Sequence, residues 1–495
     1  MASRNKTIKP LTKKQKIDRL ISGAILAFQL ITSCILVGLI LNLNMLTMKY
    51  TIPIVIVVVL FFALVLASQL IKRRNSKRKL FGRIVSLVLS CLMIFASTYV
   101  LRTSHAINAI SGADYQTQSV LVYVKADSEA NAIQDVQDGT FAINKISDRD
   151  NTDYAVQQIN EATSTTIATR EYDSYQDMYD ALLDGEVDAM IMNEAYEAIT
   201  EQYDEEFDHM VKVIYSIERQ QDVETTPVSD EMDVTKDTFT LYITGIDTYG
   251  PVSTVSRSDV NMLVTVNPQT HQILLTNIPR DYYVTLHSYG QLDKLTHAGI
   301  YGVNESMSTL EDLIGIDIDY YARVNFSSVE TIVDALGGIT VNSEYAFSAG
   351  GYSFSAGSNT LNGKEALAFS RERYSFSAGD RQRGKNQQAV ITGIINKMIS
   401  PSIITNYTNI LSAVSDSFQT SLSTSEIQSL VRMQLNDMSS WDIQTYSLDG
   451  SGASRSTYSY GSTPLYVMIP DQSTVTQAKT YIDAMESGQR ITVTE

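Results

Sequence analysis

The chain has 495 residues, enough for about three domains of ordinary size, and its 44% hydrophobic content is typical of a folded protein. Its charge is divided unevenly: residues 1–102 carry 16 lysines and arginines and one acid, whereas residues 103–495 carry 22 bases and 54 acids. Such an acidic part repels phosphate backbones and should not bind nucleic acid, and Cys34 and Cys91 lie in apolar segments that suit neither a zinc site nor a disulfide framework.

Three apolar stretches, residues 20–41, 51–71 and 84–101, are each long enough to cross a membrane. The tail of residues 1–19 and the loop of residues 72–83 are rich in lysine and arginine, whereas the loop between the first two stretches has only Lys49. Because basic loops stay in the cytoplasm, we expect a multi-pass protein of the cell membrane with a cytoplasmic N-terminus and extracellular C-terminal domains. A nucleic-acid patch at residues 72–79 is the less favoured interpretation, since the topology already explains these charges.

Beyond a polar linker at residues 103–116, residues 117–218 predict a small accessory α/β domain. VLVYVKAD and VDAMIMN are typical of strands, and residues 174–183 have helical spacing. No catalytic motif is present in this stretch, which favours a structural or partner-binding module. Residues 219–236, with Pro227, predict an acidic linker.

Residues 237–490 predict a larger α/β domain with a largely buried sheet. Strands are expected at TFTLYITGID, VNMLVTVN, QILLTNI and ALAFSRERY. Helices are expected at residues 306–313, at residues 327–336 before Gly337 and Gly338, and at residues 380–398. The sequence contains no Cys/His metal cluster, phosphate-binding loop of the G-x-x-x-x-G-K type or G-x-S-x-G elbow.

Pairs of charged residues stand two apart in the predicted strands. Arg257 and Asp259 lie at the start of one strand, and Arg371 and Arg373 lie on or just after ALAFS. Residues two apart point to the same face of a strand. Two guanidinium groups on one face repel each other unless an anion lies between them, which indicates an anion site.

The helix at residues 380–398 places charge on its apolar stripe. Asp380, Arg383 and Gln387 share that stripe with Val390 and Ile394, which must face the core. Buried charge costs several kcal/mol unless it is paired, so these side chains need a partner.

Arginine and aspartate at the other strand ends complete a candidate site. Arg280, in IPRD, is a further arginine, and arginine binds phosphate through paired donors. Asp247 and Asp259 are ligands of the kind that Mg²⁺ takes together with substrate phosphates. The pattern therefore predicts a pyrophosphate held by arginines and bridged to Mg²⁺. The alternative is ordinary ion pairing, with Asp281 as the partner of Arg280 and a cross-strand bridge between Arg257 and Asp259.

Five runs carry a resemblance to a known family: GIDTYGPVSTVSRSDV, IPRD, DKLTHAGIYG, ALAFSRER and GDRQRGKNQQ. In this order, over residues 238–400, they resemble the LytR-CpsA-Psr family, and the three apolar stretches with an accessory domain resemble its streptococcal capsule-operon members. The resemblance implies an α/β/α domain with a central mixed sheet. It also implies a Mg²⁺-dependent phosphotransferase that attaches a polyprenyl (undecaprenyl) pyrophosphate-linked glycopolymer, above all capsular polysaccharide, to peptidoglycan.

The resemblance also implies roles for individual residues. Asp247 and Asp259 would bind Mg²⁺ and, with Arg280, form the catalytic group, and either aspartate is a candidate for the base. Asp380 and Gln387 would orient the arginines or the phosphate. The residues that would hold the pyrophosphate are Arg257, Arg280, Arg371, Arg373, Arg383 and Gln387.

Asn386, Ile246 and the Tyr301–Gly302 pair depart from the family pattern without removing any of these residues. Two other functions remain open: a membrane regulator of capsule synthesis that binds the lipid-linked polymer and contacts capsule-synthesis proteins, and a polyprenyl-pyrophosphate hydrolase.

Overall fold

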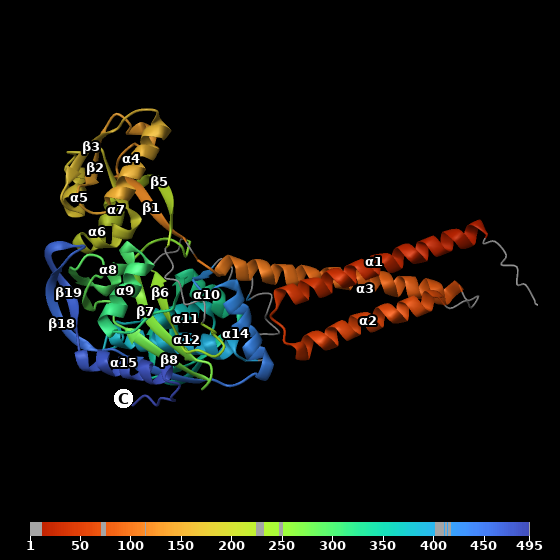
Figure 1. The fold of residues 1–495 in the computed structure, drawn as a ribbon. Coiled ribbons are helices and arrows are strands. Elements are labelled where there is room, and N and C mark those ends of the chain that lie inside the picture. Colours follow the sequence, from red (N-terminus) through yellow and green to blue (C-terminus); the bar gives the residue numbers. More distant parts are fainter. Residues whose placement is uncertain are drawn as a thin grey trace, which may run out of the picture. The chain divides into compact units, whose positions relative to one another are not determined.

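The computed structural model describes residues 12–70, 76–113, 115–223, 232–246, 251–400, 410, 413 and 417–494. The chain forms two compact units, one of residues 1–108 with 425–438 and the other of residues 109–424 with 439–495 (Figure 1). Each unit is described by itself below.

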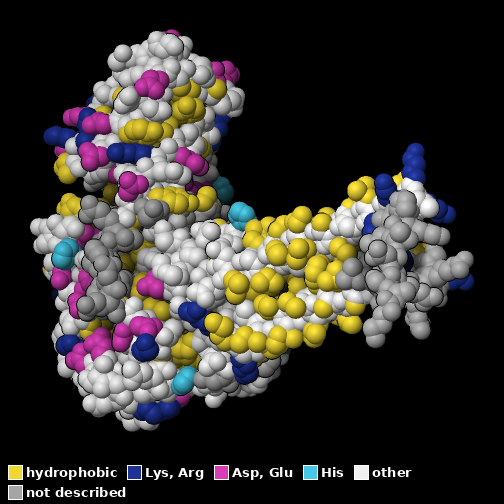
Figure 2. All heavy atoms as spheres, turned by 45° about the vertical axis from the view of Figure 1, so that its right-hand side comes forward, with side chains coloured by type: hydrophobic (Ala, Val, Ile, Leu, Met, Phe, Trp, Pro, Cys, Tyr) yellow, Lys and Arg dark blue, Asp and Glu magenta, His cyan; other side chains and the backbone are white. Residues whose placement is uncertain are grey.

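The first unit holds three long apolar helices, α1 (Lys13–Leu43), α2 (Met48–Leu70) and α3 (Ser76–Ile110), with α14 (Thr424–Asp437). All three are long and apolar enough to cross a membrane. Their leucine, isoleucine and phenylalanine side chains are exposed along their length, as Figure 2 shows. This confirms the three predicted helices, although residue 71 lies outside the described residues.

The linker predicted at residues 103–116 was wrong in its first half, because α3 continues to Ile110. Ile107 and Ile110 are buried, and extending a helix that has already formed costs little. The sequence had suggested a linker because the residues after Arg102 are polar on average.

The accessory domain is a five-stranded sheet of order β3-β2-β4-β1-β5, in which β2, β3 and β4 are parallel and β1 is antiparallel to β4 and β5. It runs from Tyr115 to Asp222, slightly beyond the predicted 117–218, and most of the predicted linker at residues 224–231 lies outside the described residues. Its elements are β1 (Tyr115–Lys125), η1 (Ile133–Asp135), β2 (Thr140–Asn144), α4 (Arg149–Thr163), β3 (Ala168–Tyr172), α5 (Tyr175–Leu183), β4 (Ala189–Asn193), η2 (Glu194–Tyr196), α6 (Glu197–Tyr203), α7 (Phe207–Met210) and β5 (Val211–Asp222).

Glu197 makes the stability of the accessory domain depend on pH. Burial raises its pKa to about 7, more than offsetting the hydrogen bond that its Oε1 accepts from the Tyr123 hydroxyl at 2.6 Å. A carboxyl whose pKa is raised on folding destabilises the fold where it is charged, so stability should fall as pH rises from about 4.3, the pKa in the unfolded chain, to about 7, and then level off. Glu197→Gln keeps the acceptor, and we expect it to stabilise the domain by about 2 kcal/mol at pH 8 but little at pH 5.

Chemical unfolding of the full chain at both pH values, followed by a probe in the accessory domain, checks this expectation. Glu161→Gln, which alters an exposed carboxyl group on α4 of the same domain, is the control. Equal effects of Glu197→Gln at pH 5 and pH 8 would contradict it.

The larger domain is built on a mixed six-stranded sheet of order β16-β11-β6-β7-β8-β17. The strands are β6 (Phe239–Ile246), β7 (Ser258–Asn267), β8 (Gln272–Ile278), β11 (Tyr320–Asn325), β16 (Phe418–Thr420) and β17 (Asp442–Ser447). β11 is parallel to β6 and β17 to β8, and the other neighbours are antiparallel. The central strands β6, β7 and β8 carry apolar side chains on both faces, as expected of a sheet covered on both sides.

Helices cover both faces of this sheet, which confirms the expected α/β/α layers (Figure 1). On one face, Tyr242, Leu263 and Leu274 pack with α9 (Val303–Ile314) and α15 (Gln472–Glu486). On the other face, Met262 and Leu275 pack with α12 (Asp380–Met398). The remaining elements are β9 (Tyr283–Thr285), β10 (Leu292–Lys294), α8 (Leu295–Ala298), η3 (Gly299–Tyr301), α10 (Phe326–Ala335), β12 (Ile339–Ser343), β13 (Phe347–Ala349), β14 (Tyr352–Phe354), β15 (Gly357–Leu361), α11 (Gly363–Arg371), β18 (Gly450–Thr457) and β19 (Gly461–Pro470).

The strand predicted at ALAFSRERY was wrong, because this segment forms helix α11. The Asn362 side chain accepts a hydrogen bond from the Glu365 backbone N–H at 3.0 Å, and the Glu365 carboxylate accepts one from the Asn362 N–H at 2.8 Å. This reciprocal capping box starts a helix. Arg371 and Arg373 therefore do not share a strand face: Arg371 ends the helix and Arg373 lies beyond it.

The predicted helices of this domain are confirmed. Residues 306–313 lie within α9, residues 327–336 nearly coincide with α10, and residues 380–398 are those of α12. Gly337 and Gly338 follow α10 with φ of 76° and 87°, a left-handed conformation that glycine adopts without strain.

Candidate functional site

The first part of the site is an ion pair between two neighbouring strands. Asp259 lies in β7, and Arg280 follows β8, which pairs with β7 in the register Asn261 to Ile278. Arg280 Nη1 donates to Asp259 Oδ1 at 2.8 Å, and Thr296 Oγ1 donates to the same oxygen at 3.3 Å. The side chains of Arg280 and Asp259 are only 18% and 11% exposed, so this is a largely buried pair.

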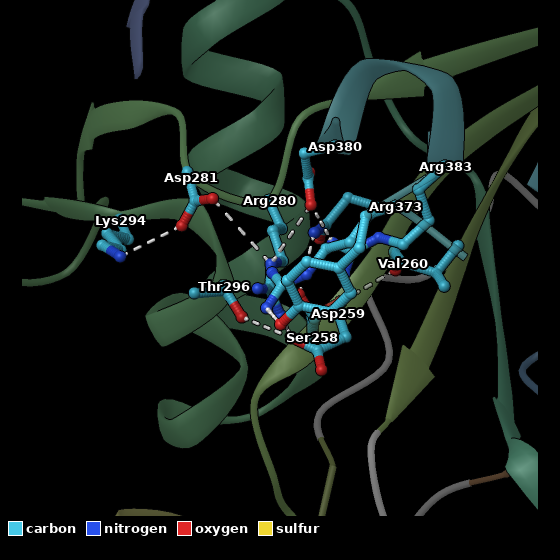
Figure 3. A network of polar contacts seen from close by, with 12 residues as sticks. Ser258, Asp259, Val260, Arg280, Asp281, Lys294, Thr296, Arg373, Asp380 and Arg383 are labelled. Atoms are coloured by element: carbon cyan, nitrogen blue, oxygen red, sulfur yellow. Dashed lines mark hydrogen bonds and ion pairs between the residues drawn. The ribbon is translucent and has the colours of Figure 1, made fainter. Parts of the chain in front are cut away.

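The N-terminus of α12 brings a second ion pair to the first. Arg383 Nη2 lies 2.5 Å from Asp380 Oδ1, and Arg280 Nε lies 3.9 Å from the same oxygen. Figure 3 shows Arg280 between the carboxylates of Asp259 and Asp380, with Arg383 beyond Asp380. The predicted inward direction of Asp380 and Arg383 is therefore confirmed. We call Asp259, Arg280, Asp380 and Arg383 the arginine cluster.

The carboxylates of the cluster offset the burial of Arg280 more fully than that of Arg383. Burial disfavours the charge of Arg280, but Asp259, Asp281 and Asp380 outweigh it and raise its pKa. Burial and the positive charge of Arg280 together lower the pKa of Arg383, and its neighbour Asp380 does not offset them. Arg383 shares its partner Asp380 with Arg280, and Arg373 adds positive charge nearby, so a bound anion would stabilise this group of arginines.

Asp259 remains ionised despite its burial. Burial favours its neutral form, but Arg280, Arg257 and Arg383 outweigh this effect and lower its pKa. One buried donor of the cluster, Arg280 Nε, makes no hydrogen bond among the described residues. An unsatisfied buried donor is costly and indicates a place where a ligand can bond.

The other predicted residues lie at different distances from this cluster. Arg257 is half-buried just before β7, close enough for its charge to lower the pKa of Asp259. Arg373 adds positive charge near Arg383 and donates to the Tyr374 hydroxyl at 2.7 Å. Arg371 is exposed at the end of α11, and Gln387 is half-buried. In the part of the chain that the structure describes, Gln387 makes no hydrogen bond to the cluster. Asp247 lies outside the described residues.

The segment DKLTHAG holds residues that the sequence interpretation missed. Lys294 Nζ lies 3.0 Å from Asp281 Oδ1, whereas Arg280 is 3.9 Å from Asp281, so Asp281 is mainly the partner of Lys294. Buried Asp293 binds His297 Nδ1 at 2.6 Å and accepts from Ser459 Oγ at 2.5 Å. These pairs fix the turn that delivers Thr296 to Asp259. The available signal was the group of charged and polar residues around Leu295, namely Asp293, Lys294, Thr296 and His297.

The arginine cluster, with the arginines beside it, is suited to binding a multiply charged anion. Arg280 and Arg383 contribute forked donors, and Arg257 and Arg373 add positive charge beside them. No group of three or more histidine, cysteine, aspartate or glutamate side chains suited to a metal occurs among the residues that the structure describes. Asp259 Oδ2 makes no hydrogen bond there, so one carboxylate oxygen is available to a cation.

Comparison of the sequence with family models gives two matches. A model described as the LytR_cpsA_psr family matches residues 202–480, more than half of the chain. A model described as DNA polymerase processivity factor matches residues 76–192, much less than half, and that stretch joins most of α3 to part of the accessory sheet.

Curated relatives include proteins named polyisoprenyl-teichoic acid–peptidoglycan teichoic acid transferase TagU. The one from Bacillus subtilis (strain 168) is 39% identical over 188 residues, 38% of this chain and 61% of the relative. The one from Enterococcus faecalis (strain ATCC 700802 / V583) is 37% identical over 198 residues, 39% of this chain and 65% of the relative. The chain thus spans less than two thirds of the length of either.

Solved structures with sequence similarity include those of two B. subtilis proteins. The crystal structure of TagU is 33% identical and covers 52% of this chain and 100% of its own, with a TM-score of 0.40. That of TagV is 26% identical and covers 52% of this chain and 99% of its own, with a TM-score of 0.43. The arginine cluster falls wholly within the residues matched by the first family model, and the chain belongs to the LytR_cpsA_psr family.

Proposed function

We propose that the protein is a membrane-anchored transferase that moves a glycopolymer from polyprenyl pyrophosphate to a hydroxyl group of peptidoglycan. The observation that carries the proposal is that Arg257 and Arg373 add positive charge beside the two ion pairs of the arginine cluster, an excess that a pyrophosphate would neutralise. The printed names of the relatives, which are teichoic acid transferases to peptidoglycan, support this reaction class. The N-terminus would be cytoplasmic and residues after 110 extracellular, where peptidoglycan lies.

The transfer exchanges one phosphorus–oxygen bond for another. The acceptor hydroxyl oxygen attacks the phosphorus that bears the glycopolymer, the bond to the bridging oxygen breaks, and polyprenyl phosphate leaves with that electron pair. The hydroxyl proton passes to a base, and the product is a phosphodiester. Phosphoryl transfer depends mainly on positioning and charge stabilisation, which Arg280 and Arg383 would supply from two different elements.

The ion pairs hold the arginines in place, which suits them to stabilise charge without moving during the reaction. Arg280 is held by carboxylates on β7 and α12, so its donors are oriented before the substrate arrives. Arg383 is the arginine whose compensation is incomplete. Arg257 and Arg373 would approach the outer phosphate oxygens, and Arg371 and Gln387 would contact the pyrophosphate or the sugar beside it.

Magnesium is part of the proposal, because Mg²⁺ in proteins typically binds one or two carboxylates together with substrate phosphates. Asp259 fits this role in part: Oδ1 is engaged by Arg280 and Thr296, whereas Oδ2 is available. Asp247 would be the second ligand. When bound, the ion would neutralise negative charge on the pyrophosphate. The lowered pKa of Asp259 makes it a weak proton acceptor, so Asp247 is the better candidate for the base.

The polymer that we propose is a capsular polysaccharide, because the three apolar helices and the accessory domain resemble the capsule-operon members of the family. Teichoic acid is the second candidate, supported by the names of the relatives. Capsule-synthesis proteins are proposed partners of the membrane helices or of the accessory domain.

The proposal is tested with the full chain in lipid nanodiscs, supplied with lipid-linked polymer, peptidoglycan fragments and Mg²⁺. We expect polymer to become attached to the fragments, and chelation with EDTA to lower the rate by at least about 100-fold, as expected when charge stabilisation of this kind is lost. Free phosphorylated polymer would instead indicate a hydrolase. Tight binding of the lipid-linked polymer without turnover would indicate a regulator, and either result would refute the transferase.

A further inference from the structure

A small open cavity lies near the arginine cluster in the same compact unit. It has a volume of about 20 Å³ and lies between the end of β6, the start of β1 and the N-terminus of α9. Thr244, Gly302, Ser306, Arg323 and Gln116 line it, and no residue of the arginine cluster does. We call it the Arg323 pocket.

Arg323 is a buried cation whose guanidinium lies over the Tyr321 ring, 5.3 Å from the ring centroid. Arg323 lies in β11 and is only 4% exposed, and this burial lowers the pKa of its guanidinium. Within the described ranges, no carboxylate lies within ion-pair distance of its guanidinium. Its hydrogen bonds go to the Tyr115 carbonyl at 3.4 Å, Gln419 Oε1 at 3.4 Å and Gln116 Oε1 at 3.3 Å. All three are longer than the usual 2.7–3.2 Å, so they compensate the charge weakly.

The N-terminus of α9 adds a second positive feature to the pocket. This 12-residue helix begins after Gly302, and no side chain caps its first turn. Its first N–H groups and its dipole therefore favour an anion. Glu305, the acid of that turn, does not neutralise the pocket, because its carboxylate accepts hydrogen bonds from Ser288 N at 3.1 Å and Thr309 Oγ1 at 3.4 Å.

A buried hydroxyl group also lines the pocket. Ser306 is 1% exposed, and its Oγ makes no hydrogen bond of normal geometry. The Tyr242 hydroxyl donates to Asn261 Oδ1 at 2.6 Å and lies close enough to Ser306 for the serine to lower its pKa against the effect of burial. Ser306 can therefore turn its hydroxyl group either to Tyr242 or to a ligand.

We propose that the Arg323 pocket binds a small oxyanion, a carboxylate or a phosphate group, through the Arg323 guanidinium, the Ser306 hydroxyl and the N-terminus of α9. The pocket borders the arginine cluster through one hydrogen bond, between Thr244 Oγ1 and Ser258 Oγ at 2.7 Å, and Ser258 precedes Asp259. A ligand that fills both sites would carry an acidic group in addition to its pyrophosphate. The binding of a free oxyanion does not depend on the proposed transfer reaction.

The test uses the full chain in detergent with Arg383→Met, which removes anion binding by the arginine cluster. Inorganic phosphate and acetate are titrated at constant ionic strength, and binding is followed by calorimetry and by the thermal unfolding midpoint. We expect saturable binding of at least one of these anions. Adding Arg323→Met should weaken that binding at least about tenfold, because a buried charge-assisted hydrogen bond is lost. Adding Arg323→Lys instead should weaken it less, because lysine keeps the charge and part of the hydrogen bonding.

A purely structural role for Arg323 predicts a different pattern. If Arg323 only links β1 to β11, Arg323→Met lowers the unfolding midpoint equally with and without anion, and neither anion binds saturably. That result would overturn the proposal. Ser306→Ala gives a second measurement if Arg323→Met does not fold: weaker anion binding supports the site, and unchanged binding overturns it.

The source of the anion is distinguished by adding lipid-linked polymer to the protein without Arg383→Met. If the Arg323-dependent binding of phosphate persists, the pocket takes an anion from solution. If the polymer displaces it, an acidic group of the polymer occupies the pocket. Both results support an oxyanion site.

Discussion

Arg383→Met should nearly abolish polymer transfer, with a smaller loss of stability than we expect for Arg280→Met. In the unliganded protein its removal breaks the ion pair with Asp380, but Arg280 remains 3.9 Å from that carboxylate, and burial and the charge of Arg280 disfavour the Arg383 guanidinium. With pyrophosphate bound, the same guanidinium would make charge-assisted hydrogen bonds worth several kcal/mol, so donor affinity should fall at least about 100-fold. Binding of polyprenyl pyrophosphate, the transfer rate and the unfolding midpoint of the full chain measure the three effects.

Lys385→Met is the matched control for this experiment. Lys385 lies on the same helix, its side chain is 49% exposed, and it pairs with Glu344 at 3.2 Å, away from the cluster. It should change transfer by less than about twofold, because exposed ion pairs contribute little. Transfer by Arg383→Met within threefold of the unaltered protein would mean that Arg383 does not contact the substrate.

Arg280→Met should also abolish transfer, but with a large loss of stability. Arg280 is the nearest cation to Asp259, at 2.8 Å, and its loss leaves that carboxylate largely buried and poorly compensated. Breaking a buried ion pair by removing one partner costs about 3–5 kcal/mol. We expect a loss of about 3 kcal/mol at pH 7.5, measured by urea unfolding of the full chain with a probe in the larger domain.

The pH dependence of this loss identifies its cause. In the unaltered protein the pKa of Asp259 is lowered, so its contribution to stability is present above the pKa of the unfolded chain and is lost only in strong acid. Without Arg280, the pKa of Asp259 should rise above that of the unfolded chain. Its destabilising effect should then be largest at neutral pH and shrink as pH falls toward 5.

Combining Arg280→Met with Asp259→Asn removes both charges and provides the control. The double variant should recover more than half of the lost stability but none of the transfer activity. Stability no higher than that of Arg280→Met alone would show that the loss does not come from an uncompensated Asp259 carboxylate.

Local patterns in the sequence were sufficient to predict several helices that matter to the proposed function. The apolar stretches predicted α1, α2 and α3, and helical spacing predicted α12 with Asp380 and Arg383 directed inward. The strand at ALAFSRERY was a wrong interpretation of a short apolar run. The Asn362-x-x-Glu365 pattern before it was the signal for a helix start, and it is also local.

The sequence by itself predicted which side chains the proposed chemistry uses, namely the arginines and aspartates near strand ends and at the start of α12. Only the tertiary structure decided how their charges are balanced. Arg280 receives its partners through the register of β7 with β8 and the approach of α12, whereas Arg383 remains undercompensated and Arg323 has no carboxylate within reach among the described residues. The physical reason is that the strength of an ion pair depends on distance and burial, and segments far apart in the chain set both.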